Sequence, residues 1–203
     1  MKKIKLLIVS ILIIFYSSIL IADDFNDWKV KFKKRAINEG VSKFTVDKLI
    51  DRSKFLSDVI KYDRYQPEFY EDTKTYILKR TSSKKVKLGN IILNKENSII
   101  NKVSSEYKVD KNLLLALMGI ETNFGNYLGK MDIVSSLATL SYDQRRSEFF
   151  TKELITLLKL VDAKIINPST LFGSWAGAFG NFQFMPSTIK NHAIDYDKDG
   201  SID

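Results

Sequence analysis

Glu121 is the residue of this sequence whose position most suggests chemistry. It lies four residues after Leu117, so on a helix it shares the side that carries an apolar stripe. The stripe consists of Leu113, Leu114, Leu117, Ile120 and Phe124. A carboxyl group buried among apolar residues stays protonated near neutral pH and can protonate a glycosidic oxygen. The pattern predicts a buried Glu121, but on the helix alone a structural glutamate with a local hydrogen-bond partner is the stronger interpretation.

A second set of acidic residues has the spacing of a metal site. The stretch Asp195-Tyr-Asp197-Lys-Asp199-Gly200-Ser201-Ile-Asp203 fits the first nine positions of an EF-hand calcium loop. Asp195, Asp197 and Asp199 would be carboxylate ligands, and Ser201 would offer its backbone carbonyl. A solvated acidic turn is the alternative. The twelfth position, where a bidentate carboxylate belongs, would be residue 206, which is not among residues 1–203. We therefore expect these residues to bind a structural Ca²⁺ weakly. The chemistry itself does not need this ion.

Other kinds of chemistry find no support in the composition. The chain has no cysteine, which removes disulfides, thiolate metal sites and a cysteine nucleophile. His192 is the only histidine, so neither a catalytic triad nor a zinc site is expected, and we interpret it as a structural or surface residue. No nucleic-acid-binding motif accompanies the net charge of +8. Residues 84–87 form a dense basic cluster, interpreted as a turn between helices.

Residues 1–22 resemble a secretory signal peptide. A basic leader is followed by 17 uncharged residues from Leu6 to Ala22 and then by two aspartates. The length is at the lower limit for a membrane span, so a retained anchor is the alternative. Cleavage would remove three lysines and lower the net charge from +8 to +5. We expect an exported, periplasmic protein, associated with the membrane only if the leader is retained.

The elements that would position Glu121 are mainly helices. Apolar spacing predicts two helices within residues 25–56, an extended or looping stretch over 61–68 and a helix over 69–78. It then predicts a long helix over 91–107, one opening at Asp110, one over 147–161, a glycine-rich loop over 173–180 and a short helix from Pro186. Only nine Gly and three Pro interrupt the chain, so the fold class is mainly α.

Three blocks of sequence resemble the membrane-bound lytic transglycosylase B family, a group of lytic murein transglycosylases. The first is Gly119-Ile-Glu121-Thr-Asn-Phe-Gly125. The second is Ser136-Leu-Ala-Thr-Leu140, with Arg145-Arg146 and Phe149-Phe150 beyond it. The third and most specific is Gly173-Ser-Trp-Ala-Gly177-Ala-Phe-Gly180-Asn-Phe-Gln183-Phe-Met-Pro186-Ser. The resemblance extends from about Tyr62 to the end of the chain.

This resemblance implies a lysozyme-like helical catalytic domain over residues 86–203, with a small helical N-terminal segment over 23–85. Glu121 matches the catalytic acid/base of the family. Ser174 and Gln183 match positions that hydrogen-bond the sugar near the cleavage point. Tyr76 falls where an aromatic residue lines the groove, and an ordinary core aromatic is the alternative for it. Family members normally continue past the calcium loop, so the resemblance leaves the activity of residues 1–203 open.

The resemblance also implies a reaction, cleavage of peptidoglycan between N-acetylmuramic acid and N-acetylglucosamine without water. A glycoside hydrolase needs a second carboxylate, about 5–5.5 Å from the first in a retaining enzyme and about 6.5–9.5 Å away in an inverting one. Asp132 and Asp143 follow Glu121 most closely, and neither lies in a motif for that role. In the family the muramoyl C6 hydroxyl attacks its own C1 instead, which gives a 1,6-anhydro ring.

Two other functions stay open at this point. One is a module that binds glycan strands without cutting them, and the other is a lysozyme-type hydrolase. In each case the expected partner is the peptidoglycan glycan strand, with no nucleic acid, and we expect a monomer.

Overall fold

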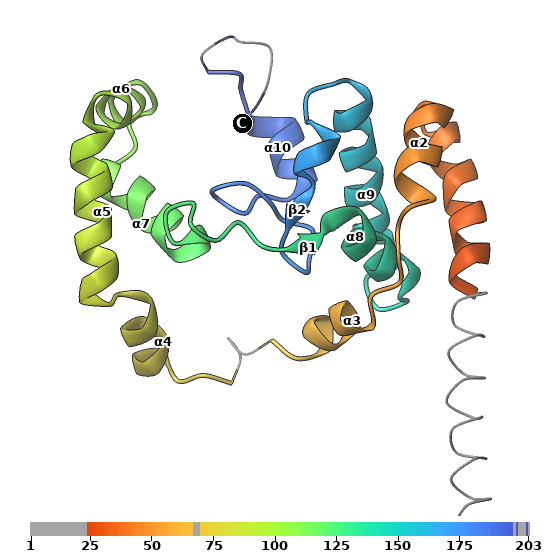
Figure 1. Cartoon of the computed structure of the whole chain (residues 1–203), viewed down its shortest axis with the longest axis horizontal. Coiled ribbons are helices and arrows are strands. Elements are labelled where there is room, and N and C mark those ends of the chain that lie inside the picture. The colour runs from red at the N-terminus through yellow and green to blue at the C-terminus, as the bar shows by residue number, and fades with distance from the viewer. Residues whose placement is uncertain (1–23, 67–69, 197, 199–201, 203) are drawn as a thin grey trace, which may run out of the picture.

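The computed structural model describes residues 24–66, 70–196, 198 and 202 and consists mainly of α-helices, with one two-stranded sheet in the described part. Figure 1 shows two groups of helices on either side of a central region of loops. Residues 24–64 and 131–193 form one group, called the body here. Residues 73–122 form the other group, called the arm. The predicted fold class is therefore confirmed. Among the described residues, no helix combines the length and apolar character needed to cross a membrane.

The body is built around α8. Its elements are a first helix (residues 24–38), α2 (Lys43–Ile50), α3 (Ser57–Arg64), β1 (Met131–Asp132), α8 (Ile133–Tyr142), α9 (Ser147–Asp162), a 3-10 turn (Pro168–Thr170), β2 (Phe172–Gly173) and α10 (Pro186–His192). Residues 133–141 are all buried, and α8 packs mainly on α9 and also on α2 and α3. Leu137, Leu154 and Leu157 are fully buried in this core. Each such side chain stabilises the fold by about 1.5–3 kcal/mol.

The first helix joins this core through aromatic contacts. The rings of Trp28 and Phe32 stack with centroids 5.0 Å apart, and Ala36 is fully buried. Gly40 follows the helix with φ of +95°, a backbone conformation that glycine adopts without strain. Ser42 then caps α2 by accepting a hydrogen bond from the Thr45 N–H at 3.2 Å. The two helices predicted within residues 25–56 are confirmed.

The arm has very little core. Its helices are α4 (Thr73–Arg80), α5 (Ser83–Lys95), α6 (Asn97–Tyr107) and α7 (Lys111–Thr122). Neither α4 nor α5 has a buried residue. Across residues 73–122, all of them described, the large apolar side chains that are buried are Ile100 and Leu115. The arm therefore depends on partly exposed contacts of α5 and α6 with each other and with α7.

Two local predictions for the arm are wrong. The expected long helix over 91–107 is two helices, because Glu96 leaves the helical conformation and α6 turns to pack against α5. Asn94, Asn97 and Ser98 around the break have low helix propensity. The basic cluster at 84–87 lies in the first turns of α5, capped by Ser82, and is not a turn between helices.

The stretch 61–68 is expected to be extended or looping, but its first four residues belong to α3, which ends at Arg64. Residues 67–69 lie outside the described part. The domain boundary expected between residues 85 and 86 falls inside α5. Residues 24–64 share their core with α8 and α9. The division into an N-terminal segment over 23–85 and a catalytic domain over 86–203 stays a prediction.

Candidate functional site

Glu121 lies in the last turn of α7, where the chain leaves the helix in an unusual way. Asn123, Phe124 and Gly125 have φ values of +51°, +59° and +77°. A left-handed conformation is uncommon for a bulky residue such as Phe124 and marks a position that the surroundings impose. The Phe124 N–H donates to the Met118 carbonyl at 3.1 Å, which satisfies one of the carbonyl groups at the end of the helix.

The ring of Phe124 explains why two glycines face it. A Cβ atom added at Gly119 of α7 would lie 2.7 Å from Phe124 Cζ, and one added at Gly89 of α5 would lie 3.0 Å from the same atom. The ring therefore packs between α5 and α7 in space that only glycines leave open. This packing fixes the end of α7, and with it the backbone at Glu121.

Thr122 connects Glu121 to the glycine-rich loop. Its side chain is fully buried. The Thr122 hydroxyl is a donor to the Asn181 carbonyl oxygen at 2.8 Å and to the Met118 carbonyl oxygen at 3.1 Å. The same oxygen accepts a hydrogen bond from the Gly125 N–H at 3.0 Å. The residue after Glu121 thus joins two blocks of sequence that are about 60 positions apart.

The loop after β2 is held in shape by its own hydrogen bonds. Ser174 Oγ accepts from the Ala178 N–H at 3.0 Å, and the backbones of Phe179 and Phe184 exchange two hydrogen bonds of 3.1 Å. Gln183 has φ of +50°, and its Nε2 donates to the carbonyls of Leu128 at 3.1 Å and Gly180 at 3.0 Å. The Gln183 side chain therefore fastens the segment 123–130 to this loop.

The sheet and two close approaches place this loop beside the start of α8. Strand β1 pairs antiparallel with β2, with Met131 opposite Gly173. A Cβ atom at Gly129 would lie 2.1 Å from the Gly173 carbonyl oxygen, and one at Gly177 would lie 2.4 Å from the Leu137 side chain. These contacts explain why the loop contains glycines at positions that the sequence alone marks only as irregular.

Burial of Glu121 is the main prediction that the structure contradicts. Glu121 is exposed. The apolar spacing predicts that Leu113, Leu117 and Ile120 form a buried stripe, yet these side chains are 56%, 45% and 43% exposed. Helix α7 is apolar on most of its surface, and it buries the opposite side, through Leu115, Gly119 and Thr122. A pattern of apolar residues around a whole helix does not say which side faces the core.

The two acids that follow Glu121 in the sequence have other partners. Asp132 caps α8 by accepting from the Ser135 N–H at 2.7 Å. Asp143 accepts two hydrogen bonds from Arg64 Nη2, at 2.8 and 3.1 Å. Both carboxylates are therefore engaged in holding the body together.

Tyr76 lies on α4, in the arm. The guanidinium carbon of Arg80 lies 3.8 Å from the centroid of its ring, a cation–π contact. Arg80 in turn lines a groove between α5 and α7 together with Gly119 and Ile120. Arg80 thus contacts Tyr76 and also lines the groove beside the helix that carries Glu121. The position of Tyr76 along a bound glycan stays a prediction. His192 is exposed on α10, in agreement with the structural or surface role expected for it.

A buried ionic cluster was not recognised from the sequence. Asp63 is buried at the end of α3 and forms ion pairs with Arg145, at 2.8 Å, and with Arg146. Burial by itself would raise the pKa of the Asp63 carboxyl, but the hydrogen bonds from Arg146 and Arg145 hold this pKa below its ordinary value. Both halves of the cluster lie in conspicuous stretches, Tyr62-Asp-Arg and Arg145-Arg146, and only the fold brings them together.

The calcium prediction concerns residues that are mostly outside the described part. Asp197, Asp199 and Ser201 lie there, and Asp195 is half-buried in the segment after α10. Among the described residues, no group of three or more potential metal ligands lies together. Next to Asp195, the Tyr196 hydroxyl donates to Glu106 Oε2 at 3.1 Å, and the Lys102 ammonium lies 5.0 Å from the Tyr196 ring centroid. This contact attaches the segment after α10 to α6.

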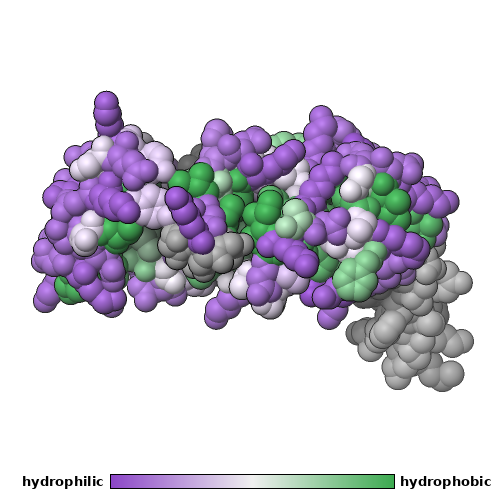
Figure 2. Space-filling model, turned by 90° about the horizontal axis from the view of Figure 1, so that it is seen from above, coloured by the Kyte–Doolittle hydropathy of each residue, from purple (hydrophilic) through white to green (hydrophobic). Residues whose placement is uncertain are grey.

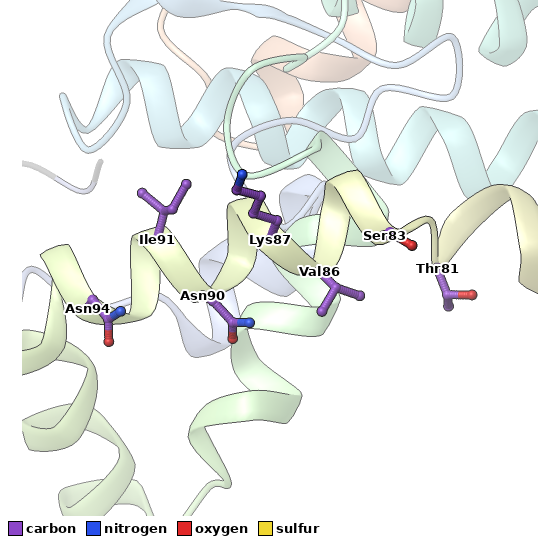
Figure 3. Close-up of a pocket in the computed structure, with 7 residues that line it drawn as sticks. All are labelled: Thr81, Ser83, Val86, Lys87, Asn90, Ile91 and Asn94. Carbon is purple, nitrogen blue, oxygen red and sulfur yellow. The ribbon is translucent and has the colours of Figure 1, made fainter.

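Two hollows on the arm show where side chains leave space. One, of about 440 Å³, is a shallow surface hollow that does not include Glu121. Figure 3 shows that its lining comes from α5 and the turn before it, namely Thr81, Ser83, Val86, Lys87, Asn90, Ile91 and Asn94. The other, of about 230 Å³, is the groove between α5 and α7 that ends at Ile120 and Phe124. The groove is mostly apolar and lies beside the helix of Glu121.

Comparisons with known proteins give a consistent result. The family model "Transglycosylase SLT domain" matches residues 24–203. The membrane-bound lytic murein transglycosylase B of Escherichia coli K12 is 38% identical over 118 residues, which are 58% of this chain and 33% of that protein.

Solved structures of lytic transglycosylases also resemble this chain. SltB3 of Pseudomonas aeruginosa, in complex with NAG-NAM-pentapeptide, superposes with a TM-score of 0.83 at 33% identity and covers 87% of this chain. The Escherichia coli lytic transglycosylase Slt35 with bulgecin A gives 0.77 at 31% identity and covers 86%. The chain spans 47% of the SltB3 chain and 57% of the Slt35 chain.

Proposed function

Because the chain belongs to the transglycosylase SLT domain family, we propose that it is a peptidoglycan lytic transglycosylase that cuts the β-1,4 bond between N-acetylmuramic acid and N-acetylglucosamine. The product is a 1,6-anhydromuramoyl end, formed without water, in the course of cell-wall turnover. Glu121 is the single acid/base of this reaction.

One observation carries the proposal. The hydrogen bond from Thr122 Oγ1 to the Asn181 carbonyl, at 2.8 Å, places the residue next to Glu121 against the loop that contains Ser174 and Gln183. Two blocks of sequence that resemble one family therefore meet at one place on the molecule. The SltB3 structure, in complex with a NAG-NAM-pentapeptide, has the same fold over 87% of this chain.

The reaction needs two proton transfers at one carboxyl group. Glu121 in its protonated form gives its proton to the glycosidic oxygen as the bond from that oxygen to the muramoyl C1 breaks. The resulting carboxylate takes the proton of the muramoyl C6 hydroxyl, whose oxygen forms a new bond to C1. Glu121 is then protonated again, and no water is consumed. The C6 hydroxyl belongs to the same sugar, so the nucleophile is already in place.

The partners of the other acids support ring closure over hydrolysis. A hydrolase holds a second carboxylate beside the cleavage point to activate water or to form a bond with the sugar. Asp132 caps α8 and Asp143 binds Arg64, so neither is free for that task. We propose that Ser174 and Gln183 contact the sugar beside the cleavage point and that Tyr76 lines the groove further along.

The test is to incubate the purified chain with cell-wall sacculi and to identify the soluble products by mass spectrometry. Anhydromuropeptides are the expected products. Replacing Glu121 by Gln removes the proton that the leaving oxygen needs, so we expect the rate to fall by about 100- to 10,000-fold while glycan binding is retained. The matched control is Glu96→Gln, which removes another exposed arm carboxylate, one whose partner is the Lys95 ammonium at 2.8 Å. Substantial activity in Glu121→Gln would rule out the assignment.

The exposure of Glu121 favours one alternative, a module that binds glycan strands without cutting them. Retention of the chain on sacculi without any soluble product would identify this function. Reducing muramic ends among the products would instead identify a hydrolase.

We further propose that the protein is exported through residues 1–22 and acts in the periplasm as a monomer, with membrane association only if this leader is retained. The acidic loop that begins at Asp195 is proposed as a structural calcium site, because its spacing fits the first positions of an EF-hand. Slt35 of Escherichia coli forms a complex with calcium. Calcium titration followed by isothermal calorimetry tests the loop directly.

A further inference from the structure

Glu153 is a buried acid that the proposed reaction does not use. It lies on α9 inside the body and is 5% exposed. Its Oε2 accepts a hydrogen bond from the Ser187 N–H at 2.9 Å, and its Oε1 accepts one from the Ser187 hydroxyl at 2.6 Å. Acidic side chains are almost never buried unless a partner satisfies them. The two bonds are therefore what keeps Glu153 inside the body, and they hold Ser187 in return.

Ser187 lies in the first turn of α10, directly after the glycine-rich loop. The N-cap position is Met185, whose side chain makes no capping hydrogen bond and packs against the body core instead. Pro186 follows and has no N–H to satisfy. The N–H of Ser187 is one of the groups that find no partner inside their own helix. Glu153 therefore caps α10 from a different helix, because the local cap position is used for packing.

The segment between Gln183 and Ser187 is short and has little freedom. The backbones of Phe184 and Phe179 exchange two hydrogen bonds of 3.1 Å. Two residues after Phe184, the ring of Pro186 fixes one backbone angle. A shift of Ser187 would therefore move Gln183, four residues before it, because the chain between them cannot absorb the change.

The other contacts of the glycine-rich loop leave its last part to Glu153. The pairing of β1 with β2 holds its beginning, and the Thr122 hydroxyl holds its middle through the Asn181 carbonyl at 2.8 Å. Its last part leads into α10, which packs on α9 (Figure 1). Figure 2 shows apolar surface in the middle of the molecule as seen from above, the part where α10 lies in Figure 1. Apolar contacts are not directional, so the hydrogen bonds of Glu153 are what sets the position of α10 along α9.

We propose that Glu153 is a positioning residue for the cleavage site. It holds the start of α10 on α9 and thereby fixes where Gln183 meets the sugar. The proposal rests on the proposed function, because it gives Glu153 a part in the same reaction. Glu153 acts through Ser187, to which both of its oxygens are bonded. A displacement of about 1 Å at a reacting centre can lower a rate by about 100-fold, so a contact remote from the cleaved bond can control the rate.

Asp162 provides a matched control on the same helix. It is the last residue of α9, and its carboxyl group accepts hydrogen bonds from the Ser42 N–H at 3.0 Å and from the Ser42 hydroxyl. Ser42 caps α2, a helix that carries none of the residues assigned to the cleavage site. Glu153→Met and Asp162→Met each remove both acceptor oxygens and introduce a residue that favours helices.

The first test measures the initial rate of anhydromuropeptide release at several concentrations of sacculi, per folded molecule as determined by circular dichroism. We expect Glu153→Met to lower the maximal rate by about 10- to 100-fold with little change in the half-saturating concentration. Asp162→Met should keep the parent rate. Glu153→Gln should stay within about threefold of the parent, because its amide can accept from the Ser187 N–H and donate to the Ser187 hydroxyl. An acid that only stabilised the fold would change the folded fraction and leave the rate per folded molecule unchanged.

The second test does not depend on activity. Hydrogen exchange followed by mass spectrometry reports on the amides of Gln183 and Phe184, whose N–H groups are bonded within the loop. We expect these amides to exchange about tenfold faster in Glu153→Met, since a hydrogen bond of ordinary strength no longer restrains the loop. In Asp162→Met they should exchange as in the parent chain, and exchange in α2 should become faster instead.

A milder pair of variants applies if Glu153→Met does not fold. Ser187→Ala removes only the hydroxyl contact with Glu153, and Ser42→Ala removes the corresponding contact with Asp162. We expect Ser187→Ala to lower the maximal rate by about threefold, since the bond from the N–H remains. Ser42→Ala should keep the parent rate per folded molecule.

The outcomes separate this proposal from the proposed function. An unchanged rate per folded molecule in Glu153→Met, or equal losses in Glu153→Met and Asp162→Met, would overturn the role of Glu153 and leave the function in place. Unchanged exchange of the loop amides would contradict the contact itself. If the parent chain releases no anhydromuropeptides while the loop exchanges faster in Glu153→Met, the proposed function is wrong and Glu153 holds the loop for another purpose.

Discussion

The body and the arm are both helical, but they are stabilised in different ways. In the body, α8 is buried along residues 133–141 and is surrounded by other helices. In the arm, α4 and α5 have no buried residue, and the largest buried side chains are Ile100 and Leu115. Folding free energy grows with the apolar area removed from water. The body is therefore a stable scaffold, whereas the arm, which carries Glu121, is held mainly at the few points where it touches the body and by the Phe124 ring.

This difference suggests that the two regions open to solvent at different free energies. Regions with few buried apolar contacts exchange their amide hydrogens more easily than a packed core does. Glu121, the proposed acid/base, would then lie in the less stable region. Four predictions, some with a matched second substitution, test this comparison, from the largest expected effect to the smallest.

The largest effect is expected in the body core. Leu154→Ala removes a fully buried side chain of α9 and should lower the free energy of unfolding by about 2–5 kcal/mol. Leu117→Ala in the arm removes a side chain that is 45% exposed and should cost less than about 1 kcal/mol. Urea denaturation followed by circular dichroism measures both. Equal losses would show that the arm and the body depend on one common core.

The next effect concerns the ionic cluster at the edge of the body. Asp63→Asn removes the negative charge that Arg145 and Arg146 share, and we expect a loss of about 1–3 kcal/mol. The folded-state pKa of Asp63 is lowered, so the stabilisation is complete above the unfolded-state pKa and is lost as the pH falls through the folded-state pKa. Unfolding measured over the acidic range should therefore show a weaker pH dependence in Asp63→Asn than in the parent chain. An unchanged pH profile would contradict this role of the cluster.

A third substitution tests the packing inside the arm. Gly119→Ala places a methyl group 2.7 Å from the Phe124 ring, and three ring atoms lie within 3.1 Å of it. We expect a loss of about 1–3 kcal/mol, because the ring has to move out of its site. Anhydromuropeptide release should fall as well, since the ring fixes the end of α7.

Gly89→Ala is the matched control for this substitution. Its methyl group meets the same ring at 3.0 Å, a contact that a small shift relieves, and alanine favours the helix. We expect Gly89→Ala to be close to neutral. If both variants were neutral, the Phe124 ring would not be what holds α7 against α5.

The smallest effect is expected where the arm meets the segment after α10. Tyr196→Phe removes the hydrogen bond of 3.1 Å to Glu106 but keeps the ring near Lys102. The contact is exposed, so we expect a change of less than about 1 kcal/mol. Hydrogen exchange of α6 should nevertheless become faster, because this contact is one of the points that attach the arm. Unchanged exchange in α6 would show that the contact does not restrain it.

The sequence by itself determined the helices whose caps are local. Ser42, Asp110 and Asp132 each accept hydrogen bonds from the first turn of the helix that follows them, a contact within a few residues of the chain. Gly40 likewise acts locally, through its own backbone angle. The family resemblance around Glu121, Ser174 and Gln183 was also visible in the sequence, because it consists of residue types at fixed spacing.

Only the tertiary structure decided which sides of these helices are covered. Helix α7 is apolar on most of its surface, so its pattern is compatible with burial on either side, and the contacts of Leu115, Gly119 and Thr122 select one side. The same contacts leave Glu121 exposed, where the sequence predicts a buried acid. Two of the partners of Asp63, Arg145 and Arg146, come from about 80 residues away, and no local pattern encodes such a pairing. Helix caps depend on residues close in the sequence, whereas the burial of a side chain depends on which other elements of the fold pack against it.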